Sequence, residues 1–251
     1  MGGIGSLLKL FAIIPVKKFE CSKSRMAAFL SVEERVKLSQ LLLDQTIKTL
    51  KNTTTLSEII VVSIDKRAQI AAEMQNILFL EESVEKGVNA AVSIADRYCT
   101  NYGADATIVV PQDLPLLLPE DVDMMYNIAI EHEKCLLICP SLAYDGSNLL
   151  VRKPPLLLAK THYDNGNSYF SHMTSAMESA AYVRVIFTER AMKDLDTIED
   201  AMSLVSKGGN FSNHNNNKTN NNKALLYLNS RLDSKKPWHV LRKQQGIKRN
   251  F

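Results

Sequence analysis

The sequence predicts an α/β domain with a mostly parallel sheet and helices on both of its faces. The first observation is that short buried apolar runs, bounded by turn-forming residues, alternate along the chain with segments of helical periodicity. The second is core size, because 251 residues that are 45% hydrophobic can bury one large core without a disulfide or a structural metal. No internal repeat interrupts the pattern, so residues 1–206 are interpreted as one domain.

Local signals justify the individual elements. The apolar run 7–16 predicts the first strand. Ser31 followed by Glu34 forms a capping box, and apolar residues at helical spacing continue from it to Leu50. Asp65 ends a second buried strand. In chain order, the expected elements are strand 7–16, the capped helix to Leu50, strand 59–64, a short helix from residue 66, strand 77–80, helix 84–98, strand 106–110, helix 120–132, strand 135–140, strand 182–188 and helix 198–205.

Residues 141–172 break this alternation. The stretches DGSNLL, RKPP and DNGNS concentrate glycine, asparagine, aspartate and serine, which is typical of ligand-binding loops rather than of a core. The strand at 182–188 resumes the regular pattern. We therefore expect the segment between 141 and 172 to be loops that contribute to a binding site.

The C-terminal part differs in composition from the rest. Residues 1–206 carry 20 basic and 26 acidic side chains, whereas residues 207–251 carry 10 basic side chains and one acidic one. Eight of the thirteen residues from 210 to 222 are asparagine, which predicts a disordered linker ahead of a basic tail. The tail could dock on the domain, or touch nucleic acid or another acidic surface, and nucleic acid is the less favoured partner.

Two absences bound the function further. No stretch approaches the roughly 20 apolar residues of a membrane-spanning helix, so a membrane is not expected as a partner. The cysteines are scattered without zinc-site spacing and are expected to be buried free thiols in a reducing cytoplasm. They are Cys21, Cys99, Cys135 and Cys139.

A cluster of basic residues follows the first strand. The stretch IPVKKFECSKSRM places Lys17, Lys18, Lys23 and Arg25 in a turn between that strand and the capped helix. Cations and a hydroxyl group at a strand end suit a triphosphate, because each phosphate oxygen can accept a charge-assisted hydrogen bond. The alternative is a solvated basic loop.

Acidic residues follow two other segments. Asp113 comes just after the apolar run 106–110, between two prolines, at the place where open α/β sheets bind ligands. In KDLDT, Asp194 and Asp196 are two residues apart and share one side of an extended segment. Three carboxylates together would suit magnesium, which would favour a displacement at phosphorus. For Asp113 alone, a solvated turn aspartate is the alternative.

Six motifs in one order carry a resemblance to a known family. They are IPVKKFECSKSRM, GVNAA, PQDLPLL, DGSNLL, NGNSYFSH and DLDTIEDA, spread over about residues 8–205. In this order they closely resemble the 2-phospho-L-lactate guanylyltransferase family of CofC type, which makes the diphosphate intermediate of coenzyme F(420). The resemblance implies a single-domain nucleotidyltransferase fold with a mixed, mostly parallel sheet, similar to nucleotide-diphospho-sugar transferases. It also implies a reaction that joins a phosphorylated three-carbon acid to GTP and releases pyrophosphate.

The resemblance further implies roles for individual residues. Those that would hold magnesium are Asp113, Asp194 and Asp196. Those that would bind the triphosphate of GTP are Lys17, Lys23 and Arg25, and Asn89 would lie beside the guanosine. The catalytic residues would be Lys23, Arg25 and Asp113. The acid substrate would be bound by Ser147, Asn148, Gly166 and Ser168. His172 falls where the family has a histidine, and a ligand role and a core role both fit it.

Other functions stay open at this point. A related nucleotidyltransferase with a molybdopterin or sugar-phosphate acceptor would use the same lysine, arginine and aspartate residues. A DxD glycosyltransferase of similar fold would use a nucleotide sugar, and a nucleic-acid-binding protein would depend on the basic tail. Phospholactate, phosphoenolpyruvate and 3-phosphoglycerate all fit as the acid, because their contacts are largely to backbone. A homodimer is suggested by the resemblance only.

Overall fold

The computed structural model describes residues 7–208 and 222–234, in which strands and helices alternate for most of the chain. The strands are β1 (Leu10–Val16), β2 (Leu56–Ser63), β3 (Leu78–Glu81), β4 (Ala106–Val109), β5 (Cys135–Pro140), β6 (Ser147–Lys153) and β7 (Tyr182–Val185). The helices are α1 (Val32–Lys51), α2 (Lys66–Met74), α3 (Val88–Asn101), α4 (Pro119–Ala129), α5 (Ser168–Glu178), α6 (Ile198–Gly208) and α7 (Lys223–Ser234). Short 3₁₀ turns lie at Phe19–Cys21, Ser24–Met26 and Tyr163–Asn165.

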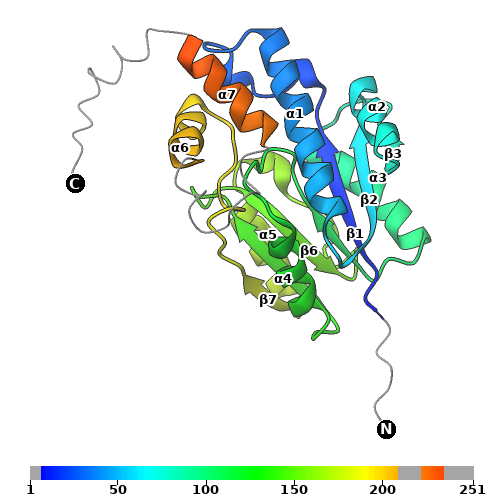
Figure 1. Ribbon diagram of the computed structural model, residues 1–251. Helices are drawn as coiled ribbons and strands as arrows, with labels where there is room; N and C mark the ends of the chain where they lie inside the picture. The colour runs from blue at the N-terminus through cyan, green and yellow to red at the C-terminus, as the bar shows by residue number, and fades with distance from the viewer. Residues whose placement is uncertain (1–6, 209–221, 235–251) are drawn as a thin grey trace, which may run out of the picture.

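All seven strands belong to one sheet, with the order β3-β2-β1-β4-β6-β5-β7 and helices on both faces (Figure 1). β6 runs antiparallel to its neighbours β4 and β5. The other neighbouring pairs are parallel. The predicted α/β class with a mixed, mostly parallel sheet is therefore confirmed.

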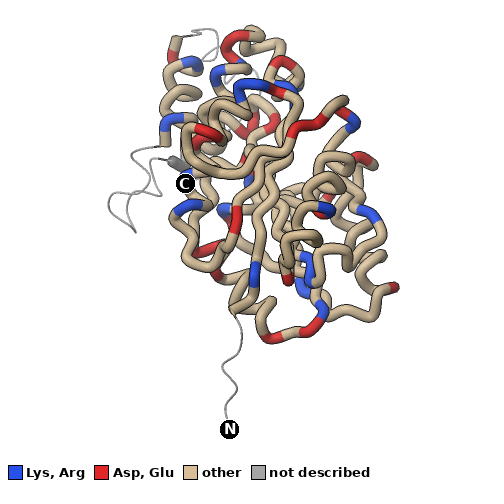
Figure 2. The backbone as a smooth tube through the Cα atoms, turned by 90° about the vertical axis from the view of Figure 1, so that its right-hand side faces the viewer, with Lys and Arg blue, Asp and Glu red and all other residues tan. Residues whose placement is uncertain are grey.

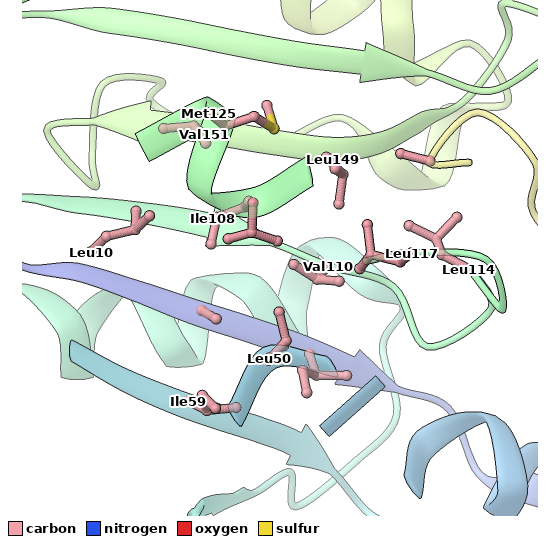
Figure 3. Close-up of a cluster of buried hydrophobic side chains, with 14 of the residues drawn as sticks. Leu10, Leu50, Ile59, Ile108, Val110, Leu114, Leu117, Met125, Leu149 and Val151 are labelled. Atoms are coloured by element: carbon pink, nitrogen blue, oxygen red, sulfur yellow. The ribbon is translucent and has the colours of Figure 1, made fainter. Parts of the chain in front are cut away.

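Helices α1, α2 and α4 cover one face of the sheet, and α3 and α5 cover the other. On the first face, Leu50 of α1 and Met125 of α4 belong to one cluster with Ile108 of β4 (Figure 3). On the other face, Val92 of α3 and Ala176 of α5 pack against alternate strand residues. Because successive side chains of a strand point to opposite faces, each central strand contributes to both cores. A fully buried aliphatic side chain contributes about 1.5–3 kcal/mol, so these cores hold the layers together.

Most predicted elements lie within a few residues of the observed ones. The capping box of α1 is confirmed, since Ser31 Oγ accepts from Glu34 N at 3.2 Å and the Glu34 carboxylate accepts from Ser31 N at 2.9 Å. The start of the helix predicted at 84–98 is wrong, because α3 begins at Val88. Gly87 before it has a φ of 91°, which lies outside the helical region.

The prediction that residues 141–172 are loops rather than core is wrong for residues 147–153 and 168–172, whereas the rest of the segment has no α-helix or strand. This segment contains β6, a buried strand inside the sheet, and the start of α5. Arg152 in β6 is only 1% exposed, and its guanidinium donates two hydrogen bonds of 2.7 Å to the carboxylate of Asp96 in α3. A third, of 3.0 Å, goes to Thr107 Oγ1. The charge of Arg152 is therefore neutralised inside the core.

Removing the partner of this buried arginine should be costly. We expect Asp96→Ala to lower the free energy of unfolding by about 3–5 kcal/mol, because it leaves the Arg152 guanidinium buried without a counter-charge. The double variant Asp96→Leu with Arg152→Met should recover most of that loss, since it removes both charges. Urea denaturation followed by circular dichroism measures all three proteins. A loss below about 1 kcal/mol for the single variant, typical of an exposed pair, would contradict this assignment.

The last described helix docks on the domain. α7 packs against α1 and α6, and its Leu228 is buried in a cluster with Leu38 of α1. Asn222, just before α7, donates from Nδ2 to the carbonyl oxygen of Pro115 at 2.6 Å. Docking, one of the alternatives for the tail, is thus observed for residues 222–234. The rest of the asparagine-rich linker and of the basic tail lies outside the described residues.

The remaining composition-based expectations can be compared with the structure. Acidic and basic residues are interspersed along the described backbone in the view of Figure 2. Within the described part of the chain, no helix combines the length and the apolar character needed to cross a membrane. All four cysteines are free, and three are buried as predicted. Cys21 is exposed, contrary to the prediction, because it lies in the short 3₁₀ turn after β1 and outside the cores.

Candidate active site

A cavity of about 430 Å³ opens at the edge of the sheet where β1 and β4 end. Because β6 is antiparallel, its first residues lie at this same edge and join the segments that follow the parallel strands. The start of α5 and the segment after β7 complete the wall. The predicted site residues that line the cavity are Lys17, Lys23, Arg25, Asp113, Ser147, Asn148, Ser168, Asp194 and Asp196.

Lys23 links two walls of the cavity. Its backbone is left-handed, with φ of 54° and ψ of 35°, a conformation that residues other than glycine adopt at a cost. The ammonium group, on a side chain only 4% exposed, donates to Asp113 Oδ2 at 2.8 Å and to Asp196 Oδ1 at 3.0 Å. Burial acts to lower the pKa of Lys23, but the two carboxylates outweigh it and hold this pKa above its usual value. The lysine is thus a fixed positive charge.

Arg25 and Lys17 are more accessible cations. The Arg25 side chain is 73% exposed, and its Nη1 lies 3.6 Å from Asp196 Oδ2. Burial acts to raise the pKa of Asp196. The nearby cations, Lys23 first among them, outweigh burial and hold this pKa below its usual value. Asp196 is therefore a carboxylate, while the two exposed cations have positive charge to offer to a ligand.

Asp194 shows the opposite shift. Burial first, and then the charges of Asp113 and Asp196, raise the pKa of Asp194 to about 6. Asn148 Nδ2 lies 3.4 Å from Asp194 Oδ1. Among the described residues, no three acidic, histidine or cysteine side chains are yet placed to hold a metal ion together. Instead, the ammonium group of Lys23 bonds to two of the three carboxylates.

Residues outside the cavity hold the basic turn in place, and sequence reasoning missed them. The guanidinium of Arg35 in α1 donates to the carbonyl oxygen of Ser22 at 2.8 Å. The carboxylate of Asp65, after β2, accepts from Phe19 N at 2.8 Å and pairs with Arg67 at 2.6 Å. In the sequence pattern, Asp65 marks only the end of a strand. No local signal indicates these contacts, because each depends on chain segments that meet only in the fold.

A chain of hydrogen bonds closes another side of the cavity. His172 Nε2 accepts from the backbone N–H of His162 at 2.8 Å, and Nδ1 lies 2.9 Å from Ser147 Oγ. Ser168 Oγ is 3.1 Å from Ser147 Oγ. Burial, and to a smaller extent the charges of His162 and Arg152, lower the pKa of His172 to about 3. The histidine lies behind the cavity, in contact with one of its walls.

Acid should therefore destabilise the protein through His172. Its folded pKa of about 3 lies below the ordinary value of 6.5, so the unfolded state binds more protons between these values and stability falls as the pH is lowered. We expect His172→Gln to flatten this part of the profile, measured by urea denaturation between about pH 7 and pH 4.

A matched control is His132→Gln, since His132 is partly exposed and stacks on Tyr182. This variant is measured over the same pH range for comparison. If His172→Gln keeps the wild-type slope of stability against pH, His172 does not cause the acid sensitivity.

Two predicted residues lie beside the described lining of the cavity. Asn89 Oδ1 accepts from Tyr163 N at 2.8 Å and from Thr161 Oγ1 at 3.0 Å. Gly166 is exposed, has a φ of 73° and turns the chain toward α5. Both residues shape the connection from 161 to 167 next to the cavity. Their contacts with guanosine and with the acid stay predictions.

Gly87→Ala tests how this connection is held. The Asp164 carboxylate accepts from Val88 N at 3.0 Å and from Asn89 N at 2.9 Å, which caps α3. A Cβ at Gly87 would lie 2.7 Å from Asp164 Oδ2, so we expect loss of the cap and of about 1–3 kcal/mol. Gly103→Ala, also at positive φ but with no atom within 4 Å of the new Cβ, measures backbone strain alone. Both variants are measured by thermal unfolding. Equal losses of stability in Gly87→Ala and Gly103→Ala would contradict the expected clash with Asp164.

The chain matches a family model described as "Guanylyl transferase CofC like" over residues 10–220. A phosphoenolpyruvate guanylyltransferase of Rubrobacter xylanophilus is 31% identical over 202 residues, which cover 80% of this chain and 96% of that protein. A 2-phospho-L-lactate guanylyltransferase of Methanobrevibacter smithii is 29% identical over 201 residues, covering 80% and 86%.

Solved structures of nucleotidyltransferases share the fold. One described as a nucleotide-diphospho-sugar transferase, from Desulfovibrio desulfuricans G20, superimposes with a TM-score of 0.69 at 12% identity over 94% of this chain and 98% of that one. A cytidylyltransferase from Leptospira borgpetersenii gives 0.57 at 11% identity over 97% and 100%. These likenesses show the fold alone, and the family match adds the class of reaction. The chain is a nucleotidyltransferase and belongs to the CofC-like guanylyl transferase family.

Proposed function

We propose that this protein transfers the guanylyl group of GTP to a phosphorylated three-carbon acid, 2-phospho-L-lactate or phosphoenolpyruvate, and releases pyrophosphate. The product would be a lactyl or enolpyruvyl diphosphoguanosine, made in the cytoplasm as a step in coenzyme F(420) biosynthesis. The names of the two relatives, which specify these two acids, support the choice of acceptor.

The observation that carries the proposal is the order of chemical groups along the edge of the sheet. β1, β4 and β6 are neighbours in that order. Cations follow β1, Asp113 follows β4, and Ser147 and Asn148 begin β6. A triphosphate at the cationic end and a small anionic acceptor at the hydroxyl end would meet over the carboxylates. This order suits a transfer between two phosphorylated molecules.

The acceptor end has donors suited to an anion. Ser147, Asn148 and Ser168 are each more than nine-tenths buried at the cavity wall. Asn148 Nδ2 already donates to the carbonyl oxygen of Ala191 at 2.9 Å, so the two serine hydroxyl groups are the side-chain donors for an anion among these three. α5 begins at Ser168, and Asn167 before it makes no side-chain cap. The first backbone N–H groups of a helix attract anions, so the start of α5 would add donors for a carboxylate or phosphate.

The transfer would be a displacement at the α-phosphorus of GTP. An oxygen of the acceptor's phosphate forms the new bond to this phosphorus, and the bond to the oxygen that bridges toward the β-phosphate breaks, so that pyrophosphate leaves. A phosphate dianion needs no general base, so catalysis would consist of positioning and charge neutralisation. Lys23 and Arg25 would offset the charge that develops on pyrophosphate.

Magnesium fits the donors at the centre of the cavity. Asp113, Asp194 and Asp196 would hold it, because it prefers carboxylate oxygens. Burial first, and then the negative charges of Asp113 and Asp196, raise the pKa of Asp194, and a bound cation would offset those charges. When bound, magnesium supplies positive charge to phosphate oxygens. For all three carboxylates to bind it, Lys23 would have to release Asp113 and Asp196, and its ammonium group would then be available to the triphosphate.

Pyrophosphate release tests the function. The protein is incubated with magnesium and GTP together with phospholactate, phosphoenolpyruvate or 3-phosphoglycerate, and ATP replaces GTP in a parallel series. We expect release that requires GTP and one of the acids, with the guanylylated acid identified by mass spectrometry. Release with none of these acids, or equal release from ATP, would refute the proposal.

Single substitutions test the assigned residues. We expect Lys23→Met and Asp113→Asn each to lower kcat about 10²–10³-fold, because each removes charge that acts on the reacting phosphates. Asp123→Asn is the control, since its carboxylate bonds to Thr55 Oγ1 at 2.6 Å and is absent from the cavity lining. It should stay within about twofold of wild type. Near-wild-type kcat in either of the first two variants would refute its assignment.

A further inference from the structure

His172 lies behind the cavity with both ring nitrogens in hydrogen bonds. It is fully buried, its Nε2 accepts from the backbone N–H of His162 at 2.8 Å, and its Nδ1 lies 2.9 Å from Ser147 Oγ. A backbone N–H can only donate a hydrogen bond. Nε2 must therefore be the ring nitrogen that carries a lone pair.

The position of the ring proton follows. Burial lowers the pKa of His172 to about 3, so the imidazole is neutral and has a single N–H. This proton is on Nδ1, from which it is donated to Ser147 Oγ. Because the partner of Nε2 is a backbone group that does not titrate, the same tautomer persists across the neutral pH range.

One of the two serine O–H groups is not used in the hydrogen bonds among His172, Ser147 and Ser168. Ser147 Oγ accepts from His172 and lies 3.1 Å from Ser168 Oγ. Within the serine pair one hydroxyl donates to the other, and the second O–H has no acceptor among these three side chains. Both serines line the cavity, and their exposed fractions are only 6% and 4%. The remaining proton is therefore available to a molecule in the cavity.

We propose that His172 is a positioning residue that makes the Ser147–Ser168 pair a hydrogen-bond donor to an ionised oxygen of the acid substrate. With the other tautomer, Ser147 would donate back to the ring, Ser168 would donate to Ser147, and no proton would be left for the substrate. The inference rests on the proposed function. Next to the two serines, the site would favour a substrate with a phosphate or carboxylate oxygen in that position. It would disfavour a substrate whose group there can only donate a hydrogen bond.

The group that fixes the tautomer is itself held in place. His162 Nε2 lies 2.9 Å from Ser175 Oγ, and the next residue, Tyr163, donates its backbone N–H to Asn89 at 2.8 Å. The Tyr163 ring also meets the His172 ring edge to face, with 4.8 Å between centroids. The His162 N–H is therefore fixed by contacts on both sides.

Two substitutions at His172 separate its two hydrogen bonds. His172→Asn keeps an amide nitrogen near the position of Nδ1, so it can still donate to Ser147, but it loses the acceptor for the His162 N–H. His172→Gln reaches the His162 N–H and loses the donor to Ser147. We expect the Gln variant to raise KM for the acid about tenfold or more, with KM for GTP within about twofold, and the Asn variant to stay within about threefold. If His172 only supported the loop around His162, the Gln variant would raise KM for the acid less than the Asn variant does. A smaller effect of Gln than of Asn would therefore overturn the inference.

A double-mutant cycle shows whether His172 acts through Ser147. We expect Ser147→Ala combined with His172→Gln to have the same KM for the acid as Ser147→Ala alone. The reason is that the hydroxyl group through which His172 acts has already been removed. A further, multiplicative rise would overturn the inference. If the Gln variant does not fold, Ser147→Ala is compared with Ser147→Ala/His172→Asn by calorimetric binding of the acid. Equal affinities support the inference, and a further loss overturns it.

The wild type separates the two hypotheses. Absence of GTP-dependent turnover with every acid would overturn the proposed function and this inference with it. A wild type that turns over, together with a Gln variant whose KM for the acid is unchanged, would overturn the inference alone.

Discussion

The bonds from the Lys23 ammonium group to Asp113 and Asp196 are the interaction on which the site depends. Carboxylates gathered in a partly buried cavity repel one another, and removing them from water is costly unless a cation is close. Lys23 provides that cation and joins the turn after β1 to two distant segments. Leu195 N, which donates to the carbonyl oxygen of Asp113 at 2.9 Å, fastens the same segments through the backbone. In a substrate complex with magnesium, the positive charge of Lys23 would shift from the carboxylates to the phosphates, and the metal ion would take its place beside the carboxylates.

The direction of β6 explains how so small a cavity combines different chemistries. In a purely parallel sheet this edge would be built only from residues that follow strands. Reversing one strand next to β4 brings Ser147 and Asn148, which begin β6, to the same edge as Asp113. Arg152 of this strand lies in the core, where Asp96 neutralises it. A buried ion pair thus supports the strand that presents the acceptor site.

Residues in segments that follow strands were predictable, and residues that depend on distant partners were not. Lys23 belongs to the basic stretch after the first apolar run, and Asp113 comes shortly after another apolar run, so local patterns indicated their place in the cavity. The strand β6 was missed because the glycine, asparagine, aspartate and serine residues around it are typical of loops, and because the partner of its Arg152, Asp96, lies 56 residues away in sequence. Asp65 and His172 were underestimated for the same reason, since their bonds to Phe19 and Ser147 exist only in the folded chain.

The most direct test of the central claim is the anomalous scattering of manganese, used in place of magnesium, in crystals grown with a non-hydrolysable GTP analogue. The account predicts an anomalous peak at bonding distance, about 2.1 Å, from carboxylate oxygens of Asp113, Asp194 and Asp196. It also predicts that the Lys23 ammonium group has moved from Asp113 and Asp196 to the triphosphate. A peak elsewhere, or a triphosphate bound away from Lys23, would contradict it.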